Sequence, residues 1–407
     1  MDQRTITRNN VRYWLRRRGM TVQQFADRCG KSKTWAEKVL AGRLTLERLP
    51  TLELVAGVLG VAPETLTDNR AAIQARTCPD PTEINALRGA LQRIEAITGI
   101  YSTGNQPAPD LRHLRQQVTY LWASFQNAGY TNLGQHLPRL LVQAQDAVAT
   151  APPDRRGEAD TLLSLTYQLA ASMLWKLRQP DLAWLAAERA LARAERCGDP
   201  LLISDAARRV AHGLLATDHA AQALDLIQAD MRRLDDGLPS ADAEYLSVYG
   251  MLPLMGAVIA GRSDRPSAAR DLLAEADEAG MRLGQDLNEH WTAFGPTNVA
   301  VHRTSVLVDL ADGAAAIQAA GGIGPEGLAT LPRERRASHE LDVARAYALC
   351  GKRVESVQYL AAAHRTAGEE IICRPVAADL IADLLDTWPG KAPAELQHLA
   401  RLIGLPV

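Results

Sequence analysis

The stretch TVQQFADRCGKSKTWAEKVLAGR, residues 21–43, determines the expected architecture of the first part of this 407-residue chain. Its regularly spaced small or apolar residues are Ala26, Gly30, Ala36 and Val39, with a polar break after the glycine. This spacing predicts two short helices that cross steeply around a tight turn. Gly30 can take the positive φ that ends the first helix, and the Ser32 side chain can cap the second.

The second of these helices would present a polar face to the solvent. The residues predicted on that face are Lys33, Thr34, Glu37 and Lys38. In a helix-turn-helix such a face enters the DNA major groove and reads base edges, while neighbouring side chains contact phosphates. The predicted DNA-binding set is completed by Gln23, Gln24, Lys31 and Arg43, nearer the phosphates, and by Ser32. Pairs of short helices are also common in proteins without this function, so the spacing alone does not establish DNA binding. The flanking sequence distinguishes the two possibilities.

The flanks resemble the lambda-repressor/Cro-like (Xre-type) DNA-binding domain over roughly residues 5–67. VRYWLRRRGMT at 11–21 is similar to the first helix of that family, and RLPTLELVAGVLGVAPETL at 48–66 is similar to its fourth and fifth helices. Gly42 matches the glycine that closes the recognition helix, whereas Val22 stands where the family usually has glutamine. The resemblance implies a five-helix domain, which we place at residues 1–69, that binds double-stranded operator DNA.

Charge is divided unevenly along the chain. Residues 1–70 contain 13 Lys/Arg and 7 Asp/Glu, whereas the remainder contains 32 and 40. A basic first part followed by an acidic second part predicts a polyanionic partner for the first part only. The consecutive Arg16, Arg17 and Arg18 could contact DNA phosphates or could form a solvated helix end, and the sequence leaves both possibilities open.

The composition predicts a soluble, all-α protein. Alanine and leucine dominate, aromatic residues make up 5%, and no apolar run reaches 18 residues. The first residues lack the apolar core of a signal peptide. The five cysteines are dispersed and never in CxxC spacing: Cys29, Cys78, Cys197, Cys350 and Cys373. We therefore expect neither a disulfide nor a zinc site, and a cytoplasmic protein without a membrane partner.

After a proline-containing linker at 70–82, the second part at 83–407 begins with a helix expected from Glu83 to Ile97 and a polar loop. From Leu111 onward the sequence repeats one pattern. Alanine- and leucine-rich segments predict helices in pairs, separated by short breaks that contain Pro, Gly or Asp. The pairs begin about 38 to 52 residues apart, somewhat more than in the tetratricopeptide (TPR) repeat. Stacked pairs of this kind form a superhelix with a concave inner surface. An irregular helical bundle is the alternative.

Four segments of this second part extend the resemblance. They are DLAWLAAERALARA at 181–194, LSVYGMLPLMGA at 246–257, NEHWTAFGPTNVAVHR at 288–303 and RRASHELDVARAYALCGK at 335–352. Together with the first part they look like actinobacterial Xre-type regulators with a C-terminal TPR-like domain. That architecture is similar to the RRNPP-type peptide-pheromone receptors of quorum sensing. The resemblance implies a transcriptional regulator whose TPR-like domain binds a signalling peptide or other small effector.

Residues 288–303 are the least helix-like segment of the second part. Asn298 and His302 lie four residues apart on one face of a helix that follows Trp291 and a Gly-Pro pair. An asparagine side chain can donate to and accept from a peptide backbone at once. With Tyr249 from an earlier helix, these residues form the predicted ligand-binding set on the inner surface. For each of them, packing in the core is the alternative.

The segments that resemble enzyme motifs are incomplete. GKRVES at 351–356 lacks the first glycine of a phosphate-binding loop, and SHELD at 338–342 lacks the second histidine of a zinc-protease helix. We therefore expect no catalysis, no cofactor and no metal.

Two classes of function remain. The first is a ligand-responsive transcription factor, expected to be a homodimer because useful specificity needs two half-sites. The second is a DNA-bound scaffold whose superhelix binds another protein without a small effector.

Overall fold

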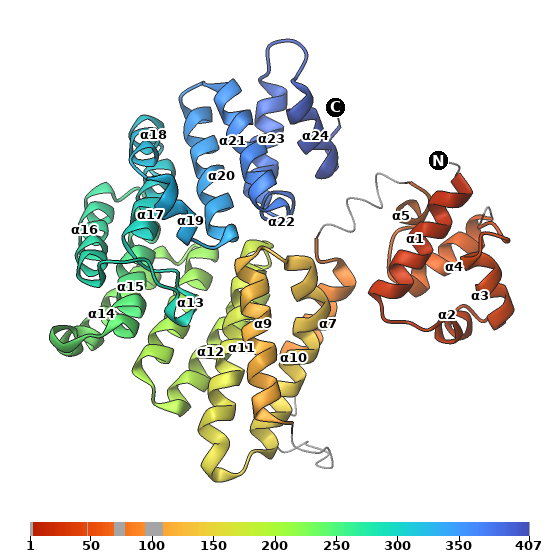
Figure 1. Cartoon of the computed structure of the whole chain (residues 1–407), viewed down its shortest axis with the longest axis horizontal. Helices are drawn as coiled ribbons and strands as arrows, with labels where there is room; N and C mark the ends of the chain where they lie inside the picture. Colours follow the sequence, from red (N-terminus) through yellow and green to blue (C-terminus); the bar gives the residue numbers. More distant parts are fainter. Residues whose placement is uncertain (1–2, 47, 69–77, 94–108, 407) are drawn as a thin grey trace.

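The computed structural model describes residues 3–46, 48–68, 78–93 and 109–406. Within these ranges all regular structure is helical, with 22 α-helices and no strands. The prediction of an all-α fold is therefore confirmed. Five helices at the N-terminus form one group, and the remaining helices form a curved array (Figure 1).

The N-terminal group encloses a small apolar core. Its helices are α1 (Gln3–Arg17), α2 (Val22–Arg28), α3 (Lys33–Leu40), α4 (Leu49–Leu59) and α5 (Pro63–Thr67). Trp14 and Phe25 are fully buried in this core. Burial of each large side chain stabilises the fold by about 1.5–3 kcal/mol. The Asn10 side chain on α1 donates a hydrogen bond of 3.0 Å to the Leu66 carbonyl on α5, which fixes the first helix to the last.

The turn between α2 and α3 has the predicted local geometry. Gly30 follows α2 with a φ of +61°, and Ser32 accepts a hydrogen bond of 3.2 Å from the Trp35 backbone N–H at the start of α3. At the start of α2, Thr21 and Gln24 cap each other reciprocally. These caps satisfy backbone donors that a short helix would otherwise leave unpaired.

The curved array contains seventeen helices in the described residues. They are α7 (Pro81–Leu91), α9 (Leu111–Gln126), α10 (Tyr130–Thr150), α11 (Arg156–Lys176), α12 (Pro180–Cys197), α13 (Pro200–Ala216), α14 (Ala220–Leu234), α15 (Ala243–Arg262), α16 (Pro266–Leu283), α17 (Pro296–Asp309), α18 (Gly313–Gly321), α19 (Pro325–Thr330), α20 (Arg333–Leu349), α21 (Arg353–Thr366), α22 (Gly368–Ile372), α23 (Pro375–Asp386) and α24 (Ala394–Leu402). The sequence did not predict the short helices α19 and α22, nor the last helix α24. Of the linker expected at 70–82, residues 70–77 lie outside the described ranges, and residues 81 and 82 belong to α7, which begins at Pro81. Residues 94–97, expected to continue this helix, also lie outside them.

One turn geometry recurs between paired helices of the array. In each case three residues join the end of one helix to the start of the next, and one of the three has a positive φ. From α9–α10 to α20–α21 these residues are Ala128, Arg178, Asp218, Asp264, Ala311 and Gly351, with φ between 53° and 71°. Five of the six are not glycine, and such residues adopt this conformation only rarely, so the recurrence of the turn indicates a repeated structural unit.

The array curves far enough for helices distant in the sequence to meet. Gln126 at the end of α9 donates a hydrogen bond of 3.2 Å to the Trp291 carbonyl, and Tyr130 of α10 donates to Glu370 of α22. Lys176 of α11 pairs with both Glu334 of α20 and Glu370. The helices between these contacts therefore surround an interior space.

Helix α15 is long and apolar enough to cross a membrane by length and composition alone. Its apolar window is 78% buried among the other helices. Most of its apolar surface therefore packs against other helices.

Candidate functional site

The surface around α3 carries the residues predicted to contact DNA. All nine are exposed: Gln23, Gln24, Lys31, Ser32, Lys33, Thr34, Glu37, Lys38 and Arg43. Three of them also make side-chain contacts within the N-terminal group: Gln23 donates a hydrogen bond to Asp27, Gln24 belongs to the α2 capping box and Ser32 caps α3. Four of the nine are cationic and only Glu37 is anionic, so this face has the charge and the accessibility that a phosphate backbone requires.

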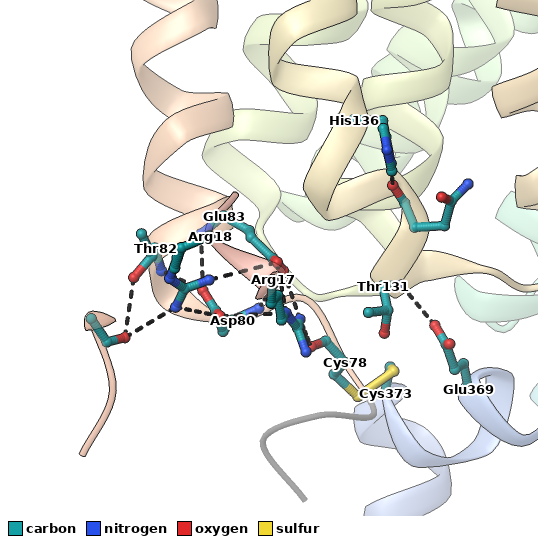
Figure 2. Close-up of polar contacts among 12 residues, drawn as sticks. Arg17, Arg18, Cys78, Asp80, Thr82, Glu83, Thr131, His136, Glu369 and Cys373 are labelled. Carbon is teal, nitrogen blue, oxygen red and sulfur yellow. Dashed lines mark hydrogen bonds and ion pairs between the residues drawn. A yellow bond between two sulfur atoms is a disulfide. The ribbon is translucent and has the colours of Figure 1, made fainter. Parts of the chain in front are cut away.

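Two of the three consecutive arginines at 16–18 follow neither of the possibilities that the sequence left open. Arg17 and Arg18, at the end of α1, contact Asp80 and Glu83 at the start of α7 (Figure 2). The Arg17 Nη2–Glu83 Oε2 distance is 2.8 Å and the Arg18 Nη2–Asp80 Oδ2 distance is 2.7 Å. The two arginine side chains are only 1% and 8% exposed. Neither is a solvated helix end nor accessible to DNA, and only Arg16 of the three remains exposed.

We call Arg17, Arg18, Asp80 and Glu83 the α1–α7 ion-pair cluster. Both guanidinium groups lie over the Trp14 ring, 4.9 and 5.0 Å from its centroid. Carboxylates at the N-terminal end of α7 pair with cations at the C-terminal end of α1, which complements both helix dipoles. This arrangement fixes the N-terminal group against the array.

A disulfide lies beside this cluster. Cys78 is bonded to Cys373 at the end of α22, with Cα atoms 5.6 Å apart, and the Arg17 guanidinium donates a hydrogen bond of 2.8 Å to the Cys78 carbonyl (Figure 2). The expectation that the cysteines form no disulfide is therefore wrong. The two cysteines are separated by 295 residues, and no local spacing indicates such a pair.

A cavity of about 530 Å³ occupies the interior of the curved array. Side chains from α9, α11, α13, α15, α17, α20 and α23 contribute to its wall. A volume of this size lies within the range of small-molecule sites in proteins. We refer to it as the central cavity.

Aromatic side chains form one part of the cavity wall. The rings of Trp122 on α9 and Trp291 are stacked, with centroids 5.2 Å apart and an interplanar angle of 10°. Trp175 lies nearby against His212, with ring centroids 5.3 Å apart. Trp122 and Trp291 belong to segments far apart in the sequence, so their contact joins α9 to the irregular segment before α17.

Of the four predicted ligand-binding residues, the structure brings only Trp291 and His302 to the cavity wall. Asn298 is fully buried behind them; its amide donates to the Thr292 carbonyl at 3.4 Å, and its Oδ1 atom has no hydrogen-bond partner among the described residues. Tyr249 is buried too, and its hydroxyl donates to Glu275 on α16. These two positions match the packing alternative.

His302 is a neutral histidine with a defined orientation. Its Nδ1 atom donates a hydrogen bond of 2.8 Å to the Asn298 carbonyl, and its Nε2 atom lies 3.5 Å from the Arg335 Nη1 atom. Burial lowers the pKa of His302 to about 3, with a further contribution from Arg335. The unprotonated Nε2 atom therefore faces the Arg335 guanidinium at the cavity wall.

The sequence reasoning missed the charged residues of the cavity. Arg208 and Arg209 on α13, Glu334 and Arg335 on α20, and Arg374 before α23 all line it. Arg208, Arg209 and Glu334 are buried, although charged residues are rarely buried without partners. Paired arginines inside alanine-rich helices, as in AARRVA at 206–211, could have indicated these residues. The charge count did not reveal them, because it covered the whole second part, where acidic residues outnumber basic ones.

Comparisons with known proteins give no assignment: no family model matches the chain, and no curated protein matches it. The α3 surface and the central cavity are therefore the two features that bear on function.

Proposed function

We propose that this chain is a sequence-specific DNA-binding regulator of the Xre type, with α2 and α3 as its helix-turn-helix. The observation that carries the proposal is the α2–α3 unit itself. Its turn, caps and buried side support two short helices in a fixed arrangement, while all nine predicted contact residues remain exposed. In this proposal α3 enters the major groove with Lys33, Thr34, Glu37 and Lys38, and the remaining residues approach phosphates.

The curved array is, in this proposal, a TPR-like sensor domain. The six recurring turns between paired helices support a repeat architecture rather than an irregular bundle. The central cavity is the proposed site for a small effector, which alters DNA binding by favouring one arrangement of the array. A homodimer in the cytoplasm completes the proposal, because a domain of this size reads only one half-site.

The test is selection of bound sequences from random double-stranded DNA by the full-length protein at physiological salt. We expect one enriched motif with two related half-sites. The variant K33A/T34A/E37A/K38A should lose the preference while its circular dichroism spectrum stays unchanged. A matched control is Lys391→Ala, an exposed lysine before α24. Equal binding by the quadruple variant would show that α3 does not read the DNA.

A further inference from the structure

The central cavity has an excess of positive charge. Eight lysine and arginine side chains line it, against three carboxylates. Acidic residues that do not line the cavity themselves neutralise part of this excess: Asp205 pairs with Arg208, Glu370 pairs with Arg374, and the exposed Asp379 pairs with Arg178. Six acids therefore face eight cations, so two positive charges remain without an acid of their own.

The two cations left over are Arg209 and Arg335. Arg209 lies 3.6 Å from Asp205, but this carboxylate also pairs with Arg208, which is closer. No carboxylate among the described residues lies within ion-pair distance of Arg335. The Nε atoms of both arginines are buried and have no hydrogen-bond partner among the described residues. Arg209 therefore shares one buried carboxylate with Arg208, and half-buried Arg335 has, in the described part of the chain, only the neutral His302 ring beside it. An anionic ligand would supply the acceptors that the two buried Nε atoms lack.

The titration behaviour of neighbouring groups agrees with this excess. Burial, together with the charges of Arg208 and Arg335, lowers the pKa of Arg209 to about 9 despite Asp205. Burial alone would raise the pKa of Glu334, but Lys176 and Arg335 lower it to about 2. Both shifts have the direction expected in a region of positive potential.

We propose that the central cavity binds a ligand that combines an anionic group, carboxylate or phosphate, with a flat apolar group. The guanidinium groups of Arg209 and Arg335 hold the anion, since their planar forks match the oxygens of either group. The stacked Trp122 and Trp291 offer a flat apolar surface in the same cavity, and Arg209 lies 5.6 Å from the Trp122 ring centroid. This inference rests on the proposed effector function and specifies the chemistry of the effector.

The test uses two anionic probes and one neutral probe on the full-length protein. Indole-3-acetate carries a carboxylate, phenyl phosphate carries a phosphate, and indole-3-acetamide is the uncharged match of the first. We expect saturable binding of at least one anion at up to millimolar concentration by calorimetry, and weaker binding of the amide. Binding of only indole-3-acetate identifies a carboxylate effector, and binding of only phenyl phosphate identifies a phosphate effector.

Arg335→Gln should weaken anion binding by about tenfold or more, because it removes a charge-assisted pair. Arg335→Lys keeps the charge without the fork and should give an intermediate loss, which separates recognition from folding. Lys352→Gln, an exposed residue outside the cavity, is the control.

The proposal is overturned if neither anion binds, if the amide binds as tightly as the acid, or if both Arg335 variants retain parental affinity. None of these results bears on DNA binding by the α3 surface, because the selection of bound DNA sequences tests that separately.

Discussion

The guanidinium of Arg17 and the carboxylate of Glu83 lie 2.8 Å apart, with side chains only 1% and 8% exposed. One residue ends the first helix of the N-terminal group and the other belongs to the first turn of the array. Together with Arg18 and Asp80, they make the contact between the two parts a buried ionic one. A buried pair of this kind is sensitive to the loss of one partner, because the remaining charge stays desolvated.

We therefore expect Glu83→Ala to weaken this contact by about 3–5 kcal/mol. Calorimetric unfolding should change from a coupled transition to separate transitions for the N-terminal group and the array. Arg16→Ala, on the same turn of α1 but exposed, should leave the thermogram unchanged. In the double variant R17A/E83A, the loss should be smaller than the sum of the single losses. Additive losses would mean that the two side chains are not coupled.

The Cys78–Cys373 disulfide predicts a specific thiol count. Alkylation of the denatured protein without reductant should label three cysteines, Cys29, Cys197 and Cys350, and labelling after reduction should give five. Cys373→Ser should lower stability by about 2–5 kcal/mol, since the bond closes a long loop. Cys350→Ser, an exposed free cysteine, is the control.

The thiol count also bears on location, because cytoplasmic proteins of mesophiles keep most cysteines reduced. Five labelled thiols in protein alkylated directly in the cells would show that the bond is absent there. Three labelled thiols would show that the bond persists in the compartment where the protein resides.

His302 predicts a pH dependence of stability. Its folded pKa of about 3 lies below the unfolded value of about 6.5, so its contribution is fully present above pH 6.5 and is lost as pH falls toward 3. Between pH 7 and pH 5 the loss is about 2 kcal/mol. His302→Gln should reduce the pH dependence of urea unfolding by this amount. The control replaces His136, an exposed histidine on α10. Parallel pH profiles for the parent and the His302 variant would contradict the neutral buried state.

Substitution of Asn298 distinguishes a packing role of this residue from a ligand-contacting role. Because it is fully buried, with its amide hydrogen-bonded to Thr292, Asn298→Ala should lower stability by about 1–3 kcal/mol. Affinity for an anionic probe should stay within about twofold of the parent. If the variant keeps its melting temperature but loses probe binding, Asn298 has the ligand-contacting role that the sequence predicted.

Local features were predictable from this sequence and distant pairings were not. Gly30, Ser32 and the buried face of α3 were predictable because turn and capping preferences act over a few residues. The pairing of Arg17 with Glu83, and of Cys78 with Cys373, depends on how the array curves, and no short-range pattern encodes that. The cavity cations belong to α13 and α20, which are far apart in the chain, so their convergence follows only from the fold.

The last prediction separates phosphate contact from base reading on the α3 surface. Lys31 lies in the turn before α3 and is exposed, so it is expected to contact a phosphate, whereas Thr34 in the first turn of α3 is expected to reach a base edge. Lys31→Ala should weaken binding to the selected site and to unrelated DNA alike. It should also reduce the slope of log K against log salt by about 0.9, the value for one released counterion.

Thr34→Ala should leave that slope unchanged and cost about 1–3 kcal/mol at the selected site alone. Fluorescence anisotropy titrations of both variants across a salt series, with selected and scrambled duplexes, measure the two quantities together. If Lys31→Ala acts only on the selected sequence, or if Thr34→Ala changes the salt slope, then the two roles are assigned to the wrong residues and α3 meets the DNA in a different orientation.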